Sequence, residues 1–419
     1  MPLRSLLALV ALAFATSLVS AADHWTQFRG PNGTGHSDSK SLPTKWSDTE
    51  NVAWKTPIQG KAWSSPVVLD GQVWVTNAPP DGKWASAVCL DLDSGKIVRD
   101  IKLWDIEKPQ YCIEKNSYAS CTPVIEPGRV YVHFGAHGTA CLNTQTGEKL
   151  WDRQDLSCNH HRGPASSPIL CDDLLILTFD GFDVQYVVAL NKNTGKTVWK
   201  KDRNIEYGSD NGDIKKAYST PALFELDGKV QLVNPSAGAA ISYDPKTGDE
   251  LWRIRCGGMN VSSPPLFGKG LIYMTTAAGG FNLYAVKAGG KGDITGSHLA
   301  WKSSKAVAKK SAPLLIGNRI FMSTDDGVLS ATDATSGEPL WQKRVGGEFS
   351  ASPVFADGKI YFCGEDGVTH VVAPGAEGSE PEILAQNKLP AGFMASPAVV
   401  GNSLLLRTKT HLYRIAEKK

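Results

Sequence analysis

The chain has 419 residues and a formal net charge of +2, from 44 Lys and Arg against 42 Asp and Glu. This near balance provides no bulk charge to attract nucleic acid, and we expect no nucleic-acid partner. The eight cysteines permit disulfides in an exported protein, although a chain of this length buries a core without them.

The N-terminus has the order of a secretory signal peptide. Arg4 precedes an apolar run over 6–19, and small residues follow at 20–22. The run is shorter than the ~20 residues of a membrane span, and an uncleaved anchor is the alternative to cleavage after Ala21 or Ala22. We therefore expect an exported protein of the periplasm or cell envelope, or a secreted one, with no transmembrane segment in the mature chain. The chain divides into a signal peptide (1–22), a leader segment (23–49) and a repeat domain (50–419).

A short turn recurs along the repeat domain. In five copies Asp or Asn stands four residues before a glycine and Ser or Thr directly before it, as a tight turn requires. Trp follows the glycine by four residues in four of these five, and we expect these tryptophans to pack between neighbouring units. The copies are LDLDSGKIVRD (90–100), LNTQTGEKLWD (142–152), LNKNTGKTVWK (190–200), YDPKTGDELWR (243–253), TDATSGEPLWQ (332–342) and a looser GDITGSHLAWK (292–302).

A second pattern, small residues leading into proline and an apolar strand, occurs eight times. Seven intervals from Pro66 to Pro397 span 331 residues, so the period is about 47 residues, as in propeller blades. The copies are SSPVV (64–68), SCTPVI (120–125), SSPIL (166–170), STPAL (219–223), SSPPL (262–266), SAPLL (311–315), ASPVF (351–355) and ASPAVV (395–400). Four short strands per unit predict an all-β, eight-bladed β-propeller of four-stranded antiparallel blades.

The two ends of the repeat domain are complementary. The last unit is one strand short, while NVAWKTPI (51–58) resembles a fourth strand without the preceding three, with Trp54 at the repeated position. We predict that this N-terminal strand completes the last blade and closes the ring, which removes two exposed sheet edges.

The proline strand, the Asx turn and the trailing Trp together resemble the repeat of quinoprotein (PQQ-like) β-propellers, over about residues 50 to 416. Within that superfamily the chain resembles exported bacterial PQQ-like repeat proteins related to BamB-type outer-membrane assembly propellers. The matching segments are WTQFRGPNGTG (25–35), NSYASCTPVIEPGRVYVHFG (116–135), CNHHRGPASSPI (158–169) and LILTFDGFDVQYVVAL (175–190).

The resemblance implies a fold and a compartment, not an activity. Quinoprotein dehydrogenases hold their cofactor against a disulfide between adjacent cysteines, and no two cysteines are adjacent here. Neither their calcium ligands nor their catalytic aspartate matches a position of this chain, so we predict no catalytic residue. The lipid-bearing cysteine typical of BamB also has no counterpart after the signal-peptide region.

Strand order predicts which loops share a face. Loops between second and third strands lie with the connections between blades, and long loops often carry function. The long segments 104–120, 155–165 and 202–218 should therefore lie on one face, where a protein partner or a small ligand would bind. The candidate ligand-binding residues on this face are His137, His160, His161, Arg162, Asp180, Asp183, Glu206, Asp210 and Asp213.

The stretch CNHHRG (158–163) has three interpretations. Cys158, His160 and His161, with His137, would supply metal ligands, although adjacent histidines in an extended strand point to opposite sides. A disulfide between Cys158 and Cys112 would join two long loops of an exported protein. The third interpretation is a loop held by local hydrogen bonds with an unpaired thiol.

Two further segments leave alternatives open. The carboxylates of Asp180, Asp183, Glu206, Asp210 and Asp213 would suit calcium, although solvated turn acids are the commoner case. Arg29 in RGPNG (29–33) would either bind an anion with backbone N–H groups or lie in a turn that packs the leader segment against the ring.

No complete catalytic constellation can be assembled from these residues. We therefore expect an exported binding or scaffold protein of the cell envelope, and the alternative is a quinone- or metal-dependent oxidoreductase with an atypical site. No cofactor is predicted, PQQ or calcium being the alternatives, and the identity of any metal is left unknown. On this reading, changing His160 and Asp180 to alanine should leave folding intact and weaken ligand binding.

Overall fold

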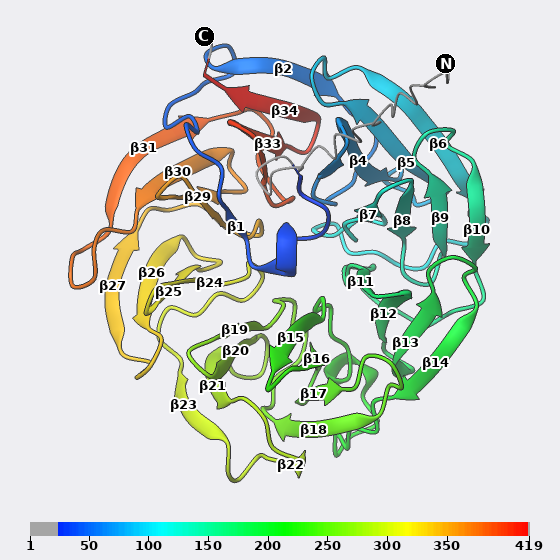
Figure 1. The fold of residues 1–419 in the computed structure, drawn as a ribbon, viewed down its shortest axis with the longest axis vertical. Coiled ribbons are helices and arrows are strands. Elements are labelled where there is room, and N and C mark those ends of the chain that lie inside the picture. Colours follow the sequence, from blue (N-terminus) through cyan, green and yellow to red (C-terminus); the bar gives the residue numbers. More distant parts are fainter. Residues whose placement is uncertain (1–23, 418–419) are drawn as a thin grey trace, which may run out of the picture.

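Eight antiparallel sheets stand around a common axis in the computed structural model, which describes residues 24–417 (Figure 1). The predicted eight-bladed, all-β propeller is confirmed. The predicted signal peptide (1–22) lies outside the described residues, and no helix among the described residues is long and apolar enough to cross a membrane.

The blades follow the chain, each running from an inner strand at the axis to an outer strand. Blades 1 to 4 consist of β3 (Val67–Leu69), β4 (Gln72–Asn77), β5 (Trp84–Asp91) and β6 (Ile97–Asp105); β7 (Val124–Glu126), β8 (Arg129–His133), β9 (Thr139–Asn143) and β10 (Lys149–Arg153); β11 (Ile169–Cys171), β12 (Leu174–Asp180), β13 (Gln185–Asn191) and β14 (Thr197–Asp202); and β15 (Ala222–Leu226), β16 (Lys229–Pro235), β17 (Ala239–Tyr243) and β18 (Glu250–Arg255).

Blades 5 to 8 repeat this order. They consist of β19 (Leu266–Gly268), β20 (Leu271–Thr276), β21 (Asn282–Lys287) and β23 (Leu299–Ser303); β24 (Leu314–Ile316), β25 (Arg319–Ser323), β26 (Val328–Asp333) and β27 (Pro339–Arg344); β28 (Val354–Ala356), β29 (Lys359–Cys363), β30 (Val368–Ala373) and β31 (Glu382–Lys388); and β32 (Ala398–Val400), β33 (Ser403–Arg407), β34 (His411–Ala416) and β2 (Val52–Pro57).

The ring closes as predicted. β2, from the N-terminal part of the chain, pairs antiparallel with β34 as the outer strand of blade 8, with Trp54 opposite Arg414 (Figure 1). Two blades have a fifth strand that the repeat did not indicate: β1 (His36–Ser37) pairs in parallel with β28, and β22 (Gly292–Asp293) pairs in parallel with β18.

The repeated tryptophans pack between blades, as expected. Trp54 lies over Gly95 in the turn of the next blade, where an added Cβ would come within 2.4 Å of the indole. Its Nε1 also donates to the carbonyl of Leu92 at 2.8 Å. Glycine is required in that turn both for its φ of +69° and because the indole occupies the space of a side chain. The same arrangement joins Trp151 to Gly195, Trp199 to Gly248 and Trp301 to Gly337.

A belt of hydrogen bonds explains why small hydroxyl residues precede the strand proline. The Ser or Thr directly before that proline accepts a hydrogen bond from the backbone N–H at the same position in the preceding blade. Six of the eight junctions have this bond: Ser65 to Thr122, Thr122 to Ser167, Ser167 to Thr220, Ala312 to Ser352, Ser352 to Ser396 and Ser396 to Ser65, all 2.9–3.0 Å. At blade 5 the equivalent residue is Pro264, which has neither hydroxyl nor N–H, so the belt is interrupted there.

This belt gives a stability prediction. Ser167→Ala leaves the buried N–H of Thr122 without its acceptor, and an unsatisfied buried donor costs about 1–3 kcal/mol. We expect the free energy of unfolding to fall by that amount in urea titrations. The control is Ser94→Ala in an exposed turn of blade 1, expected to change it by less than about 1 kcal/mol; an equal loss in both variants would contradict the role of the belt.

The first part of the leader segment lies in the axial channel, and the rest runs outward from β1 to β2 (Figure 1). Trp25 exchanges backbone hydrogen bonds of 2.9 and 2.7 Å with Val68 of β3, and the short 3₁₀ helix η2 (Pro31–Gly33) follows. Arg29 is 1% exposed, and its guanidinium donates to the carbonyls of Pro313 and Pro353 on two blades at 2.8 and 3.3 Å. The anion-binding interpretation of Arg29 is therefore wrong: the arginine fastens the leader to the ring.

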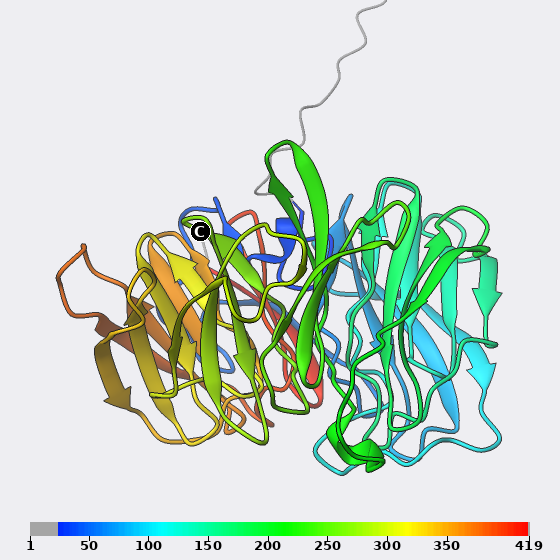
Figure 2. The same cartoon turned by 90° about the horizontal axis from the view of Figure 1, so that it is seen from below.

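The two faces of the disc differ. In the side view, the 3₁₀ helix η3 (Gly212–Ile214) projects from one face, while the hairpin of β15 and β16 extends beyond the other (Figure 2). The face of η3 carries the connections between blades, and it is the face on which the long loops were predicted.

Candidate functional site

A cavity of about 320 Å³ opens on the axis at the loop-bearing face. All eight blades contribute to its lining through two residue positions, the first and the third before the strand proline. The third positions are Trp63, Ser120, Ala165, Tyr218, Ser262, Lys310, Ser350 and Met394; the first positions that line the cavity are Ser65, Thr122, Ser167, Thr220, Ser352 and Ser396.

The alternation follows from the extended backbone that enters each inner strand. Successive side chains point to opposite sides, so the first and third positions face the axis while the second is directed between the blades. Ser219 at a second position, for example, is fully buried and donates to the carbonyl of Ser263 in the next blade at 2.7 Å. The first position is nearly uniform because the belt requires it, whereas the third varies between blades and sets the chemistry of the cavity.

Four further segments complete the cavity. Phe28 of the leader lines it from within the channel. The loop between β6 and β7 adds Ile113, Lys115 and Asn116, and the indole Nε1 of Trp63 donates to the carbonyl of Lys115 at 3.2 Å. The amides of Asn116 and Asn260 and the side chain of Arg162 also reach the cavity.

The charge of the lining has one sign. Its three ionisable cations are Lys115, Arg162 and Lys310, and no Asp, Glu, His or Cys is among the lining residues in the part of the chain described. Tyr218 is the remaining ionisable lining residue, and burial raises the pKa of its phenol, so it is neutral at ordinary pH. The lining therefore combines cationic side chains, many hydroxyl groups and the apolar surfaces of Trp63 and Met394.

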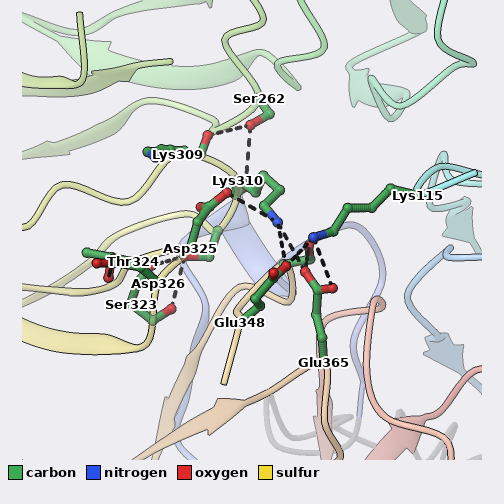
Figure 3. Close-up of polar contacts among 12 residues, drawn as sticks. Lys115, Ser262, Lys309, Lys310, Ser323, Thr324, Asp325, Asp326, Glu348 and Glu365 are labelled. Carbon is green, nitrogen blue, oxygen red and sulfur yellow. Dashed lines mark hydrogen bonds and ion pairs between the residues drawn. The ribbon is translucent and has the colours of Figure 1, made fainter. Parts of the chain in front are cut away.

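Three carboxylates adjoin this lining and hold two of its lysines (Figure 3). Lys310 lies 3.1 Å from Glu365 and 3.2 Å from Asp325, and Lys115 pairs with Glu348 and, at 3.4 Å, with Glu365. Burial opposes the charge on Lys115, but Glu348 and Glu365 outweigh it and raise its pKa. Burial likewise opposes the charge on Glu365, but Ser350 and Lys310 outweigh it and lower its pKa, so Lys115 and Glu365 are both ionised at neutral pH.

The stretch 158–163 lies beside the cavity and contributes Arg162 to it. His160 is buried and its Nε2 accepts a hydrogen bond from the N–H of Ala136 at 3.0 Å, so it joins two loops of the same face. The ring of His161 instead lies between Phe182 and Tyr111, at centroid distances of 5.0 and 6.3 Å, with a backbone φ of +61°. The two adjacent imidazoles have different surroundings, and they do not share a metal ion in this geometry.

The disulfide between Cys112 and Cys158, one of the three interpretations of this stretch, is not formed: all eight cysteines are free thiols. Cys158 is packed in the blade 2–3 core, with its sulfur 3.5 Å from His160 Nδ1, and burial raises its pKa well above the ordinary value. The Cys112 sulfur lies outside that core, 3.7 Å from the carbonyl of Arg162. The two loops are held together by this packing and by hydrogen bonds such as Gln110 Nε2 to the carbonyl of Cys158 at 2.9 Å.

The predicted acidic residues do not converge. Asp180 is buried in an ion pair with Arg203, at 2.7 and 2.9 Å, and neither carboxylate oxygen is free for a ligand. Asp183 accepts from the N–H of Asn159 at 2.7 Å, and Asp213 pairs with Lys216 and with Arg162. Glu206 is 86% exposed, Asp210 is exposed, and no group of three acid, His or Cys side chains within residues 24–417 is placed to hold a metal ion.

His137 is the remaining predicted residue. It is half-buried on the same loop face, where its Nε2 accepts from the N–H of Gln110 at 3.3 Å and its ring lies 5.6 Å from that of Tyr118. Of the predicted residues, only Arg162 lines the axial cavity. One sequence signal would have found the other cavity residues: in every blade, the residue three positions before the strand proline lines the cavity.

Comparison with known proteins agrees with this architecture. The model of the family described as outer membrane protein assembly factor BamB matches residues 48–199 and 183–419. The BamB of Legionella pneumophila is 21% identical over 245 residues, which are 58% of this chain and 48% of that protein. Quinoprotein ethanol dehydrogenase of Pseudomonas aeruginosa is 30% identical over 156 residues, 33% of this chain and 23% of the enzyme. The chain thus spans half or less of the length of these relatives.

Solved structures show the same fold. BamB from Moraxella catarrhalis superposes with a TM-score of 0.61 at 15% identity, covering 87% of this chain and 99% of that one. A europium-containing methanol dehydrogenase superposes with a TM-score of 0.55 at 14% identity, covering 92% and 89%. Because the family model covers nearly the whole repeat domain, the chain belongs to the BamB family of PQQ-like β-propellers.

Proposed function

We propose that the protein is a binding protein of the cell envelope that holds a small molecule in the axial cavity on its loop-bearing face. The observation that carries the proposal is the lining: every blade places a variable residue there, beside a belt of hydroxyl groups from six of the eight blades. A volume of about 320 Å³ is in the range of ligand sites. The signal-peptide pattern and the family support an envelope location. As a scaffold, the protein would present this same face to a partner protein.

A quinone-dependent oxidoreductase is the second candidate, favoured by the similarity to quinoprotein ethanol dehydrogenase. Oxidation of an alcohol requires a positioned group that takes up the hydroxyl proton. The cavity lining offers neither a carboxylate nor an imidazole, and the nearby Glu365 is bonded to Ser350 and Lys310. The residues at the cavity do not supply this base, which supports binding over oxidation.

Native mass spectrometry of the chain exported by its own host tests the proposal. We expect the wild-type protein to carry a small molecule, and Ala165→Trp, which fills part of the cavity, to reduce its occupancy at least about 10-fold. The denatured mass should show loss of residues 1–21 or 1–22. Ala376→Trp, in an exposed loop between β30 and β31, is the control that should retain the molecule.

Two results would contradict the proposal. Equal occupancy in wild type and Ala165→Trp, with both proteins folded by circular dichroism, would place the ligand elsewhere. A retained quinone that is reduced on adding an alcohol would establish the second candidate instead.

A further inference from the structure

Lys115 is the one residue in 24–417 whose ion pairs join blades that are not neighbours in the ring. Its partner Glu365 lies in the loop between β29 and β30 of blade 7, and Glu348 lies in the connection that leads into blade 7. Lys115 lies in the connection that leads into blade 2, so blades 8 and 1 stand between the partners. The remaining ion pairs of the described chain lie within a blade, between neighbouring blades or beside the leader. Lys115, which lines the axial cavity, therefore links loops of non-adjacent blades, and Figure 3 shows its extended side chain directed towards Glu348 and Glu365.

The lysines and the carboxylates of this cluster differ in their relation to the cavity. Lys115 and Lys310 are lining residues, and Asp325, Glu348 and Glu365 are not. The carboxylates therefore hold the ammonium groups from outside the lining. Two ammonium groups shared among three carboxylates leave the cluster with one excess negative charge, so one carboxylate can be replaced by another anion without stranding a cation.

The exposure of the carboxylates identifies the replaceable one. Glu365 is 13% exposed and is fixed by Ser350 Oγ at 2.6 Å as well as by Lys310. Glu348 is 53% exposed, and among residues 24–417 its carboxylate pairs with the two lysines alone. An exposed ion pair of this type contributes little to stability because water screens it, so its loss is a small barrier to ligand entry.

We propose that Lys115 and Lys310 recognise an anionic group of the ligand and that Glu348 is a built-in competitor, which this anion displaces when it binds. The inference rests on the proposed function and adds the ligand class: a small molecule with a carboxylate or phosphate group, whose remaining part contacts Trp63 and Met394. Charge-assisted hydrogen bonds from two ammonium groups suit either anion.

Isothermal titration of the full chain with inorganic phosphate, succinate and uncharged succinamide at low ionic strength tests the inference. Removing the competitor in Glu348→Gln should tighten binding of the two anions about 5-fold, and removing a recognition group in Lys115→Met should weaken it about 10-fold. Succinamide should bind all variants alike. The controls Glu338→Gln and Lys96→Met make the same charge changes in exposed turns of the opposite face, and should leave every affinity at the wild-type value.

The outcomes separate this inference from the proposed function. Anion affinities that are the same in Glu348→Gln and Glu338→Gln would overturn the competitor role. Succinamide binding as tightly as succinate, or no binding of either anion, would overturn the anionic class. In each case the retained molecule in the native mass spectrum decides independently whether the cavity binds a ligand at all.

Discussion

Asp180→Ala is expected to lower the free energy of unfolding by about 3–5 kcal/mol, because it strands a buried guanidinium. The side chains of Asp180 and Arg203 are 0% and 1% exposed and are joined by two hydrogen bonds. Burial opposes the charge on Arg203, but Asp180 outweighs it and raises the pKa of the guanidinium. Removing Asp180 takes away this compensation and leaves a fully buried guanidinium whose charge burial opposes. Urea titration followed by circular dichroism measures the loss. The expectation that this substitution leaves folding intact is therefore reversed.

A surface pair of the same residue types provides the control. Asp93 is 91% exposed and lies 3.0 Å from Arg414, so Asp93→Ala should cost less than about 1 kcal/mol. The double variant Asp180→Leu with Arg203→Met should be more stable than Asp180→Ala, because no buried charge remains. Similar losses for Asp180→Ala and Asp93→Ala would show that Arg203 escapes to water and would refute the argument.

As the pH falls, the protein is expected to lose stability at pH values well above those at which carboxylates titrate. Burial, with a contribution from the neighbouring His160, lowers the pKa of His133 to about 3, and burial, with His137, lowers that of His160 to about 4. In the unfolded chain both titrate near 6.5. Below pH 6.5 the unfolded state therefore binds protons that the folded state does not, and stability falls as the pH falls towards 4. Each histidine contributes up to about 1.4 kcal/mol per pH unit, or about 3 kcal/mol by pH 4.

Urea titrations at intervals from pH 7 to 4.5 measure this slope. His160→Gln keeps an acceptor for the N–H of Ala136 and removes one titrating group, so the variant should lose less stability over this interval than the wild type. His298→Gln on blade 5 is the control and should follow the wild-type curve. Parallel curves for wild type and His160→Gln would show that other groups govern the acid response.

The fold was predictable because each blade repeats the same local constraints. Glycine turns, interblade tryptophans and the residues before each proline recur at one spacing, and their agreement fixed strand number, blade number and ring closure. The shared loop face followed from strand order alone, and His137, His160 and Arg162 do lie on it.

The site was less predictable because its residues occupy the third position before each strand proline, and the residue type at this position differs from blade to blade. Lys310 or Met394 has no local motif, and each becomes a cavity residue only when eight inner strands meet at the axis. Asp180 looked like a surface ligand because sequence does not show that Arg203, two strands further on at the end of β14, bonds back to it. The disulfide between Cys112 and Cys158 could not be judged from sequence, because two loops can lie side by side without bringing their sulfur atoms together.

The closure of blade 8 has a consequence for how the protein is made. β2 is among the first strands to be synthesised, and its partner β34 is the last. Until the end of the chain emerges, β2 is an unpaired edge of the kind that promotes aggregation. The entropy cost of closing a loop grows only logarithmically with its length, so pairing β2 with β34 costs little extra free energy. The risk comes instead from the time that β2 stays unpaired. Any factor that protects the nascent chain must therefore cover β2 until residues 411–416 have been synthesised.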